Sequence, residues 1–253
     1  MLKQYILLFC FCLFLIGGGG VGSSWAGHVA LASLEWVPYT GARLPEKGSS
    51  SLVVSKAFEA AGYSASIKFF PWKRVVRMSV QGHVDGYFPV YFSLQRSKIF
   101  IFSNQIGLSP IGFIEPVGHH VDWKTLDDLK GLRIGVVDGF VNTAEFDAMV
   151  ASGELNVDSS MEDITNIKKL ALGRLDLAVI DKRVFTFLMQ SEPSLREFKD
   201  KVVFNDKLLE LKGLYVCFLR TEKGRRLVKV FNEGLGKLDW QSVQEEYFQS
   251  IMK

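Results

Sequence analysis

The chain has 253 residues and a formal net charge of +3. This nearly balanced charge argues against nucleic-acid binding, which usually requires a concentrated basic stripe. Two of its three cysteines, Cys10 and Cys12, lie near the start of the chain. A chain that loses this start would keep only Cys217, so a disulfide-linked scaffold is excluded.

The N-terminal segment has the layout of a signal peptide. Lys3 is the only charge before an apolar run over 5–16, and glycines and Ser24-Trp25-Ala26 follow. A charged start, a short apolar run and a small-residue cleavage site are typical of export signals. The run is shorter than the roughly 20 residues of a membrane span. We expect cleavage after Ala26 (signal peptide 1–26) and a periplasmic protein.

The first part of the exported chain alternates between strand and helix patterns. The expected strands cover 28–36, 63–70 and 84–91, and the expected helices cover 49–61 and 72–80. Apolar residues at helical spacing support the first helix, and Pro71 opens the second. This β-α-β-α-β order predicts a parallel sheet with helices on its faces.

A second unit with the same alternation begins near Thr125. Its expected elements are a capped turn at 125–131, strands at 132–137 and 175–180, and helices at 163–172 and 182–190. A further helix of about ten residues is expected after the turn at Asp138-Gly139-Phe140 and ends near Ala151. Short strands at 202–204 and 208–211, a strand at 214–219 and helices at 224–238 and 241–252 complete the chain. The chain after the expected cleavage, 27–253, has about 227 residues, which suits either one large domain or two lobes.

Three segments carry a specific pattern. The first joins Asp85-Gly86, Ser93, Arg96 and Phe102-Ser103. The others are TLDDLKGLRIGVVDG at 125–139 and GRLDLAVID at 173–181. In this order and spacing the chain resembles the bacterial solute-binding protein family 3, the extracytoplasmic amino-acid-binding type of receptor.

This resemblance implies a fold and a domain division. The fold is α/β and two-lobed, of the periplasmic-binding-protein type II, with a mostly parallel sheet flanked by helices in each lobe. Lobe 1 is expected to comprise 27–117 and 212–253, and lobe 2 to comprise 118–211. Hinge crossovers are expected at 114–117 and 212–214. The resemblance also implies a monomer that closes around a small molecule.

Arg96 is the first candidate for ligand binding. An arginine in a polar turn is usually only solvated, but the family's matching arginine faces the cleft and grips a ligand carboxylate. A planar guanidinium suits this role because it forms two parallel charge-assisted hydrogen bonds with a carboxylate.

Asp181 and the segment after 132–137 are the candidates from lobe 2. Asp181 ends a strand and precedes a helix, so it either caps that helix or binds the ligand's amino group, and one side chain can do both. Gly139, Phe140 and Asn142 lie where a helix is expected to open, and free backbone N–H groups there favour an anion. The family usually has a hydroxyl residue where this chain has Phe140.

Aromatic side chains are the remaining candidates. Trp36 and Trp72 match two positions that sandwich the ligand side chain in the family, although a tryptophan after a strand often packs in the core. Both are expected at the carboxyl edge of one sheet, where α/β proteins bind ligands. Further candidates by the same geometry are Tyr39, Arg74, Tyr87 and Tyr91.

Other chemistry finds little support. Adjacent His119 and His120 side chains point apart and lack further ligands, so we expect neither a metal nor a cofactor. Ser33 and Pro89-Val90-Tyr91 replace an acid and a Gly-Ile-Thr common among amino-acid binders, which suits a larger or less zwitterionic ligand.

We therefore predict a periplasmic solute-binding protein for a small carboxylate-bearing, amino-acid-like ligand, with an ABC permease as its partner and no catalytic activity. One alternative is an enzyme of the cyclohexadienyl dehydratase type, with Glu35 and Asp181 as its only candidate acid or base. The other alternative is a ligand-sensing partner of a membrane kinase.

Overall fold

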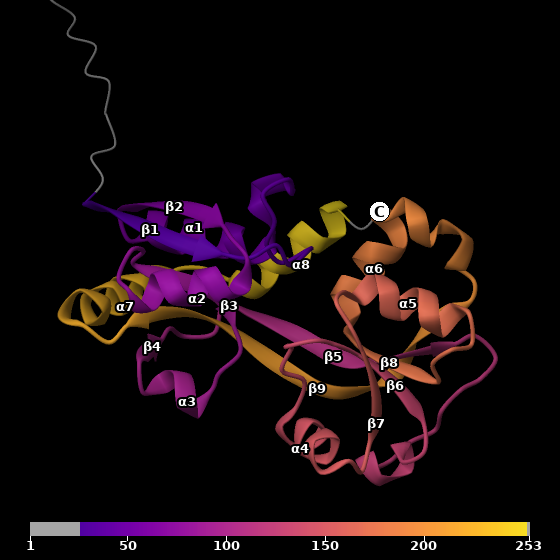
Figure 1. Cartoon of the computed structure of the whole chain (residues 1–253). Coiled ribbons are helices and arrows are strands. Elements are labelled where there is room, and N and C mark those ends of the chain that lie inside the picture. Colours follow the sequence, from indigo (N-terminus) through magenta and orange to yellow (C-terminus); the bar gives the residue numbers. More distant parts are fainter. Residues whose placement is uncertain (1–25, 252–253) are drawn as a thin grey trace, which may run out of the picture.

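The structure is a computed structural model that describes residues 26–251, so the predicted signal peptide lies almost wholly outside the described residues. The described chain forms two α/β lobes joined by long strands (Figure 1). The predicted two-lobed α/β fold is confirmed. The sheets are mixed rather than mostly parallel, because the two long connecting strands pair antiparallel with their neighbours. No helix between residues 26 and 251 is long and apolar enough to cross a membrane.

The first lobe contains the N-terminal strands and the C-terminal helices. Its strands are β1 (Gly27–Ser33), β2 (Tyr63–Phe69), β3 (Gly86–Val90) and β4 (Phe100–Phe102). Its helices are η1 (Pro45–Lys47), α1 (Ser49–Ala60), α2 (Trp72–Val80), α3 (Leu94–Ser97), α7 (Glu222–Leu235) and α8 (Trp240–Ile251). Strand β1 pairs in parallel with both β2 and β3, as the alternating pattern predicts.

The second lobe contains the middle of the chain. Its strands are β6 (Arg133–Val137), β7 (Asn156–Ser160) and β8 (Leu177–Asp181). Strand β5 (Gly107–Pro116) pairs with β8 and leads into this lobe from the first. Its helices are η2 (Leu126–Leu129), α4 (Ala144–Ser152), α5 (Asp163–Ala171), α6 (Lys182–Ser191) and η3 (Pro193–Phe198). Strand β6 pairs in parallel with β7 and β8.

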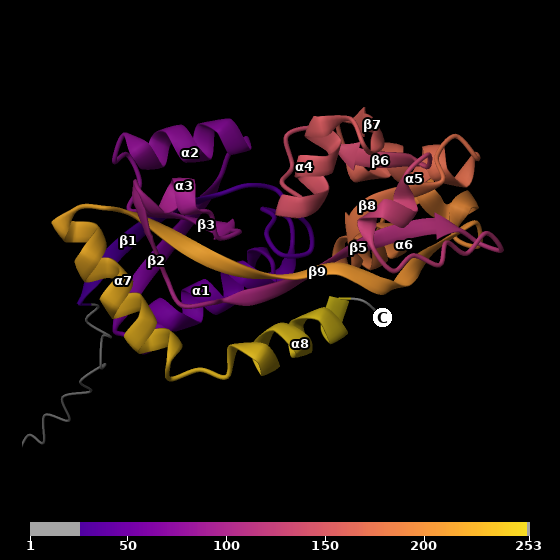
Figure 2. The ribbon, with the colours of Figure 1, turned by 90° about the horizontal axis from the view of Figure 1, so that it is seen from below.

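One strand, β9 (Val202–Leu219), runs through both lobes beside β5 (Figure 2). Its register with β5 runs from Val202 opposite Pro116 to Leu214 opposite Gly107, and its last residues pair with β3 and β4. The sequence predicted two short strands and a separate longer one here, and this division was wrong. Continuous pairing with β5 satisfies the backbone of the polar residues between the apolar runs, so the strand is not interrupted.

The strand order is β2-β1-β3-β9-β5-β8-β6-β7, with β4 paired to β9 as well. The first hinge was predicted at 114–117. Strand β5 already pairs with β8 from Ile111 to Ile114, so it joins the sheet of the second lobe before that segment. The limits of the two lobes stay a prediction.

Two further elements differ from the sequence-based expectation. Strand β7 was not predicted, because its residues are polar and mostly exposed and show no apolar alternation. Helix α4 begins at Ala144, about two residues later than predicted, since the Thr143 hydroxyl accepts a hydrogen bond from Phe146 N and caps the helix there.

The helices of the first lobe pack closely. Helix α1 buries the predicted apolar stripe, which includes Val53, Ala57 and Phe58. A Cβ at Gly234 of α7 would collide with the carbonyl oxygen of Ala57, so only glycine allows α7 to approach α1 this closely.

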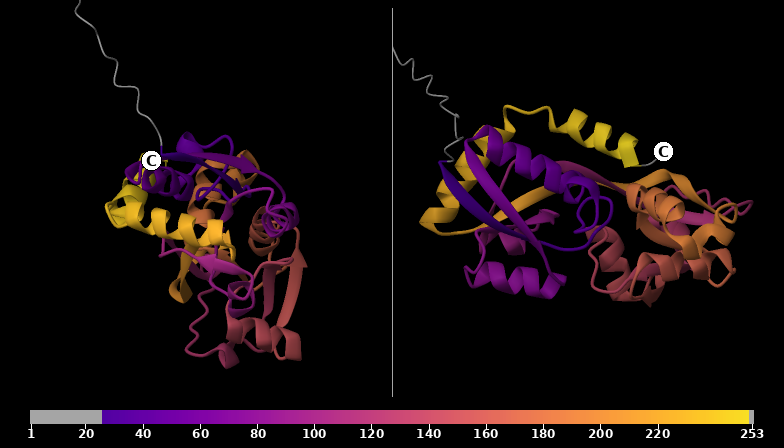
Figure 3. Two further views of the ribbon diagram at one scale, coloured as in Figure 1. Left: turned by 90° about the vertical axis from the view of Figure 1, so that its left-hand side faces the viewer. Right: turned by 90° about the horizontal axis from the view of Figure 1, so that it is seen from above.

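Helix α8 extends from the first lobe towards the second (Figure 3). The Arg183 guanidinium of α6 lies 3.9 Å from the centre of the Phe248 ring and 3.8 Å from the Glu245 carboxylate, both on α8. The last helix is thus a further contact between the lobes, beside the two long strands.

Candidate functional site

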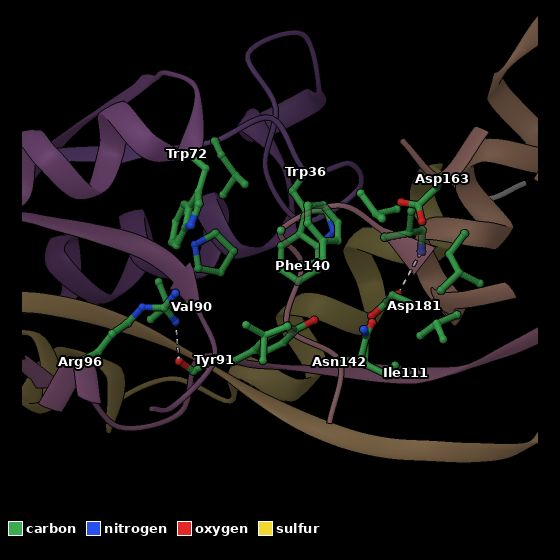
Figure 4. A pocket seen from close by; sticks show the side chains of 18 residues that line it. Trp36, Trp72, Val90, Tyr91, Arg96, Ile111, Phe140, Asn142, Asp163 and Asp181 are labelled. Carbon is green, nitrogen blue, oxygen red and sulfur yellow. Dashed lines mark hydrogen bonds between the residues drawn. The ribbon is translucent and has the colours of Figure 1, made fainter. Parts of the chain in front are cut away.

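A pocket lies between the lobes, at the ends of four strands (Figure 4). Its walls include residues at or just beyond the carboxyl ends of β1, β3, β6 and β8, the edge at which α/β sheets bind ligands. It encloses about 870 Å³ when its open mouth is counted.

Eight of the eleven predicted site residues line this pocket: Trp36, Trp72, Tyr91, Arg96, Gly139, Phe140, Asn142 and Asp181. Both lobes contribute to this set, although the residues are up to 145 positions apart in the chain. Their role as ligand contacts stays a prediction.

Arg96 belongs to the wall that lobe 1 provides. Helix α3 positions it, and the Ser93 hydroxyl caps that helix by accepting a hydrogen bond from Arg96 N. The guanidinium lies 5.4 Å from the centre of the Trp72 ring, and Nη1 donates a hydrogen bond of 3.4 Å to the Tyr91 carbonyl. No carboxylate of residues 26–251 forms an ion pair with it. The guanidinium thus has donors left for an anion.

The aromatic residues form a connected group behind Arg96. The Trp36 ring meets Tyr91 edge-on at 5.8 Å. The Tyr91 hydroxyl is 2.9 Å from the hydroxyl of buried Ser109, and Lys212 Nζ lies 4.2 Å from the centre of the Tyr91 ring. Burial raises the pKa of Tyr91, so it stays neutral at physiological pH. These contacts hold Tyr91 in place at the junction of the lobes.

Asp181 is the last residue of β8 and the cap of α6. Its Oδ1 accepts hydrogen bonds from Arg183 N (2.7 Å) and Val184 N (3.0 Å). Its Oδ2 accepts hydrogen bonds from the hydroxyls of Tyr39 and Ser109. Burial raises the pKa of Asp181, and these four hydrogen bonds oppose the rise. The structure therefore shows the capping role, with both carboxylate oxygens already engaged.

Asp163 is a second carboxylate in the pocket wall, which the sequence analysis did not identify. It is the first residue of α5, and the sequence there reads as an ordinary acidic helix start. Burial, the charge of Asp181 and the charge of Glu162 raise the pKa of Asp163 to about 7. Only the tertiary structure reveals it, because its surroundings come from distant parts of the chain.

The loop from Gly139 to Asn142 forms the rim of the second lobe. Gly139 has a φ of 73°, and the exposed side chains of Phe140 and Val141 are apolar. Phe140 N donates a hydrogen bond to the Val137 carbonyl, and Asn142 N donates to Asp147. Two of the backbone donors predicted for an anion are thus occupied, because the helix starts later than expected.

Three predicted residues lie outside the pocket lining: Tyr39, Arg74 and Tyr87. Tyr39 is fully buried and bonds to Asp181, which links the two lobes. Arg74 stacks on the Phe70 ring at 4.7 Å. Tyr87 is fully buried against Trp72 and Phe100, because β3 is covered on both faces. Their assignment to the ligand stays a prediction that this geometry does not favour.

Two further sequence-based candidates can be placed in the structure. No group of three metal-ligating side chains occurs within residues 26–251, and His120 instead contacts Glu115 at 2.7 Å. The Glu35 carboxylate accepts hydrogen bonds from Ala42 N and does not line the pocket.

Comparisons with known proteins agree with this geometry. No protein-family model matches the chain. The L-cystine-binding protein TcyJ of Escherichia coli is 30% identical over 122 residues, which cover 48% of this chain and 45% of TcyJ. The match thus spans less than half the length of that relative.

Solved structures cover more of the chain. The amino-acid ABC transporter substrate-binding protein AbpA of Streptococcus pneumoniae, bound to L-arginine, aligns with a TM-score of 0.69 at 16% identity, over 90% of this chain and 97% of its own. A histidine kinase sensor domain with similarity to periplasmic binding proteins aligns with a TM-score of 0.71 at 15% identity, over 89% and 96%. The chain therefore has the fold of the two-lobed periplasmic binding proteins, and the resemblance seen in the sequence is confirmed.

Proposed function

We propose that this protein is a periplasmic solute-binding protein that captures a small, carboxylate-bearing, amino-acid-like molecule between its lobes. The observation that carries this proposal is the Arg96 guanidinium, which lies in the pocket wall beside Trp72 with no carboxylate partner among the described residues. Arginine in a partly enclosed pocket offers two parallel donors to a carboxylate.

The surrounding walls support the same ligand class. Trp36 and Trp72 offer aromatic faces for a side chain, and Phe140 and Val141 add apolar area at the rim. The match to an L-cystine-binding protein and the structural likeness to an L-arginine-bound transporter protein both support an amino-acid-like ligand. Delivery to an ABC permease follows from that likeness as part of the proposal.

The mechanism we propose is closure by ligand. Each lobe provides one wall, so a molecule that touches both walls binds the closed arrangement better than the open one. Strands β5 and β9 are the connections about which the lobes turn, with the hinges near 114–117 and 212–214. The predicted lobe limits, 27–117 with 212–253 and 118–211, belong to this proposal.

A sensory role is the second candidate, because a histidine kinase sensor domain has the same fold. It uses the same pocket and differs only in the partner, which is a membrane kinase instead of a permease. Binding to purified permease or kinase domains in the presence of ligand would separate the two.

A catalytic role has less support. Of the two residues named for it, Glu35 lies outside the pocket lining and Asp181 is fully engaged in capping α6. Recovery of a bound probe unchanged after long incubation would agree with binding alone, and a new product would indicate an enzyme.

The test is a thermal-shift screen of the mature protein with L-amino acids, dicarboxylates, polyamines and aromatic acids. A ligand that binds the folded state raises the melting temperature by mass action. We expect at least one amino acid to do so and to reduce the radius of gyration in small-angle scattering. A panel in which no carboxylate-bearing compound stabilises the protein would reject the proposal.

A further inference from the structure

The pocket contains two carboxylates with opposite states of hydrogen bonding. Asp181 has four donors on its two oxygens, from α6, Tyr39 and Ser109. Asp163 has none: no hydrogen bond contributes to its pKa shift, and no ion pair of the described residues includes it. Both residues line the pocket, but only Asp163 has oxygens to offer.

The position of Asp163 is set by α5. It is the first residue of that helix, partly exposed at the pocket wall, and it lies with Asp181 across from Trp72 and Arg96 (Figure 4). The pocket therefore has a cation on one wall and an unpaired carboxylate on the other.

The charged groups that act on Asp163 are both negative: Asp181 of β8 and Glu162, the residue that precedes α5. The phenol of Tyr91, on the side of lobe 1, is neutral. Arg96 faces the same pocket from lobe 1 and forms no ion pair with Asp163. Burial and these two negative charges raise the pKa of Asp163 to about 7, and no cation of the described residues opposes the rise.

We propose that Asp163, and not the helix cap Asp181, receives the cationic group of the ligand, an ammonium whose carboxylate end lies on Arg96. This inference rests on the proposed function and identifies the ligand as a zwitterion. An ammonium at Asp181 would compete with the four hydrogen bonds that its carboxylate already accepts. At Asp163 the ammonium would meet carboxylate oxygens that accept no hydrogen bond in the structure.

The proposal has a second consequence that a merely structural aspartate would not produce. At pH 7 about half of the unliganded molecules carry a proton on Asp163, given a pKa of about 7. An ammonium beside the carboxylate favours the charged form, so that proton leaves when the ligand binds. Binding should therefore release part of a proton at pH 7 and weaken below that pH.

The experiment is calorimetry on wild type, Asp163→Asn and the matched control Glu162→Gln. Glu162 is the exposed neighbour, with no side-chain hydrogen bond to the helix start. The probes are L-arginine, L-glutamate and L-cystine, each beside its analogue without the α-amino group: 5-guanidinopentanoate, glutarate and 3,3′-dithiodipropionate. Titrations at pH 7 in phosphate and in Tris measure the protons exchanged.

For the amino acid that binds, Asp163→Asn should weaken affinity about 30-fold or more, since it leaves an enclosed ammonium without its counter-charge. The same variant should change affinity for the analogue less than threefold, as should Glu162→Gln for both probes. Wild type should release protons and Asp163→Asn should not. Thermal melting confirms that Asp163→Asn is folded.

Asp163→Asn with a less than fivefold loss for the amino acid, or with unchanged proton release, overturns the assignment of Asp163 while the solute-binding function stands. An equal loss for amino acid and analogue also overturns it, because the ammonium is then not the partner. If wild type itself binds none of the six probes and no other amino acid, the proposed function fails and this inference fails with it.

Discussion

The two walls of the pocket are built in different ways. The wall from lobe 1 presents Arg96 and Trp72, and the guanidinium stacks on the ring but keeps donors for an anion. The wall from lobe 2 presents Asp163 and Asp181, and burial together with the negative charge of Asp181 raises the pKa of Asp163. In the wall from lobe 1, the positive charge of Arg96 lies against the Trp72 ring. In the wall from lobe 2, Asp181 accepts four hydrogen bonds and Asp163 accepts none.

The difference shows how a single ligand can hold two lobes together. Neither wall alone complements a molecule with both a carboxylate and an ammonium, but the two walls together do. Binding free energy that depends on both walls is available only in the closed arrangement, which is the condition for ligand-driven closure. Variants that remove one charge at a time test this comparison.

The largest effect is expected from lobe 1. Arg96→Ala leaves the ligand carboxylate enclosed without a partner, which costs about 2–5 kcal/mol, or about 30-fold to several thousandfold in affinity. Arg96→Lys should recover only part of this, because an ammonium cannot make the two parallel bonds. Calorimetry with the ligand from the thermal-shift screen measures both variants.

Arg74→Ala is the matched control, since Arg74 stacks on Phe70 outside the pocket lining. It should leave affinity within threefold of wild type. If both Arg96 variants also stay within threefold, Arg96 is not in the site, and the case for a carboxylate ligand loses its main support.

The next largest effect is expected on the stability of the protein, when Asp181, which accepts four hydrogen bonds, is replaced. Asp181→Ala removes the cap of α6 and leaves the buried hydroxyls of Tyr39 and Ser109 without their acceptor. A lost cap and two unsatisfied hydroxyls together should lower the free energy of unfolding by about 3 kcal/mol. Urea denaturation at pH 7 measures this loss. A variant as stable as wild type would show that Asp181 does not hold the junction of the lobes.

The smallest effect is expected at Asp163, whose replacement should raise rather than lower the free energy of unfolding. The pKa of Asp163 is about 7 in the folded state, whereas an aspartate without neighbours, as in the unfolded chain, has a pKa of 3.8. The folded state therefore binds more protons between these values, and stability falls as pH rises through 7. Asp163→Asn removes this cost, so the unliganded variant should be more stable than wild type at pH 8 by about 2 kcal/mol, a figure halved for solvent screening.

Urea denaturation at pH 8 and pH 4 checks the sign. The advantage of Asp163→Asn should shrink towards zero at pH 4, where wild type is protonated in the folded state. An equal advantage at both values, or a less stable variant at pH 8, would mean that Asp163 is not held charged against its surroundings.

Much of the fold was predictable because local pattern and global structure agree. Apolar spacing located α1 and α2, and Thr125 with Asp128 forms the capping box expected at 125–131. Strand β7 escaped because an exposed polar strand has no periodic signal. The continuity of β9 escaped because its pairing with β5 joins residues about 100 positions apart, which no local window contains.

The site was predictable where a motif marks it. Arg96 and Asp181 were identified through resemblance, and both line the pocket. Tyr87 was chosen with Tyr91 from the same strand run, but β3 is covered on both faces, so Tyr87 turns into the core. Asp163 was missed for the opposite reason: an acid at a helix start is common. Its raised pKa arises first from burial and then from the charge of Asp181, 18 residues later in the chain, and neither is visible in the local sequence.

Helix α8 changes how the joint between the lobes must be regarded. The adjacent strands β5 and β9 form one connection between the lobes. The guanidinium of Arg183 on the Phe248 ring is a second contact, away from these strands. An arginine is attracted to an aromatic face out to about 6 Å, so from 3.9 Å it has roughly 2 Å of travel before the attraction fades. A larger separation of the lobes at this point would break the contact between α6 and α8, so opening of the pocket and the position of the last helix are linked.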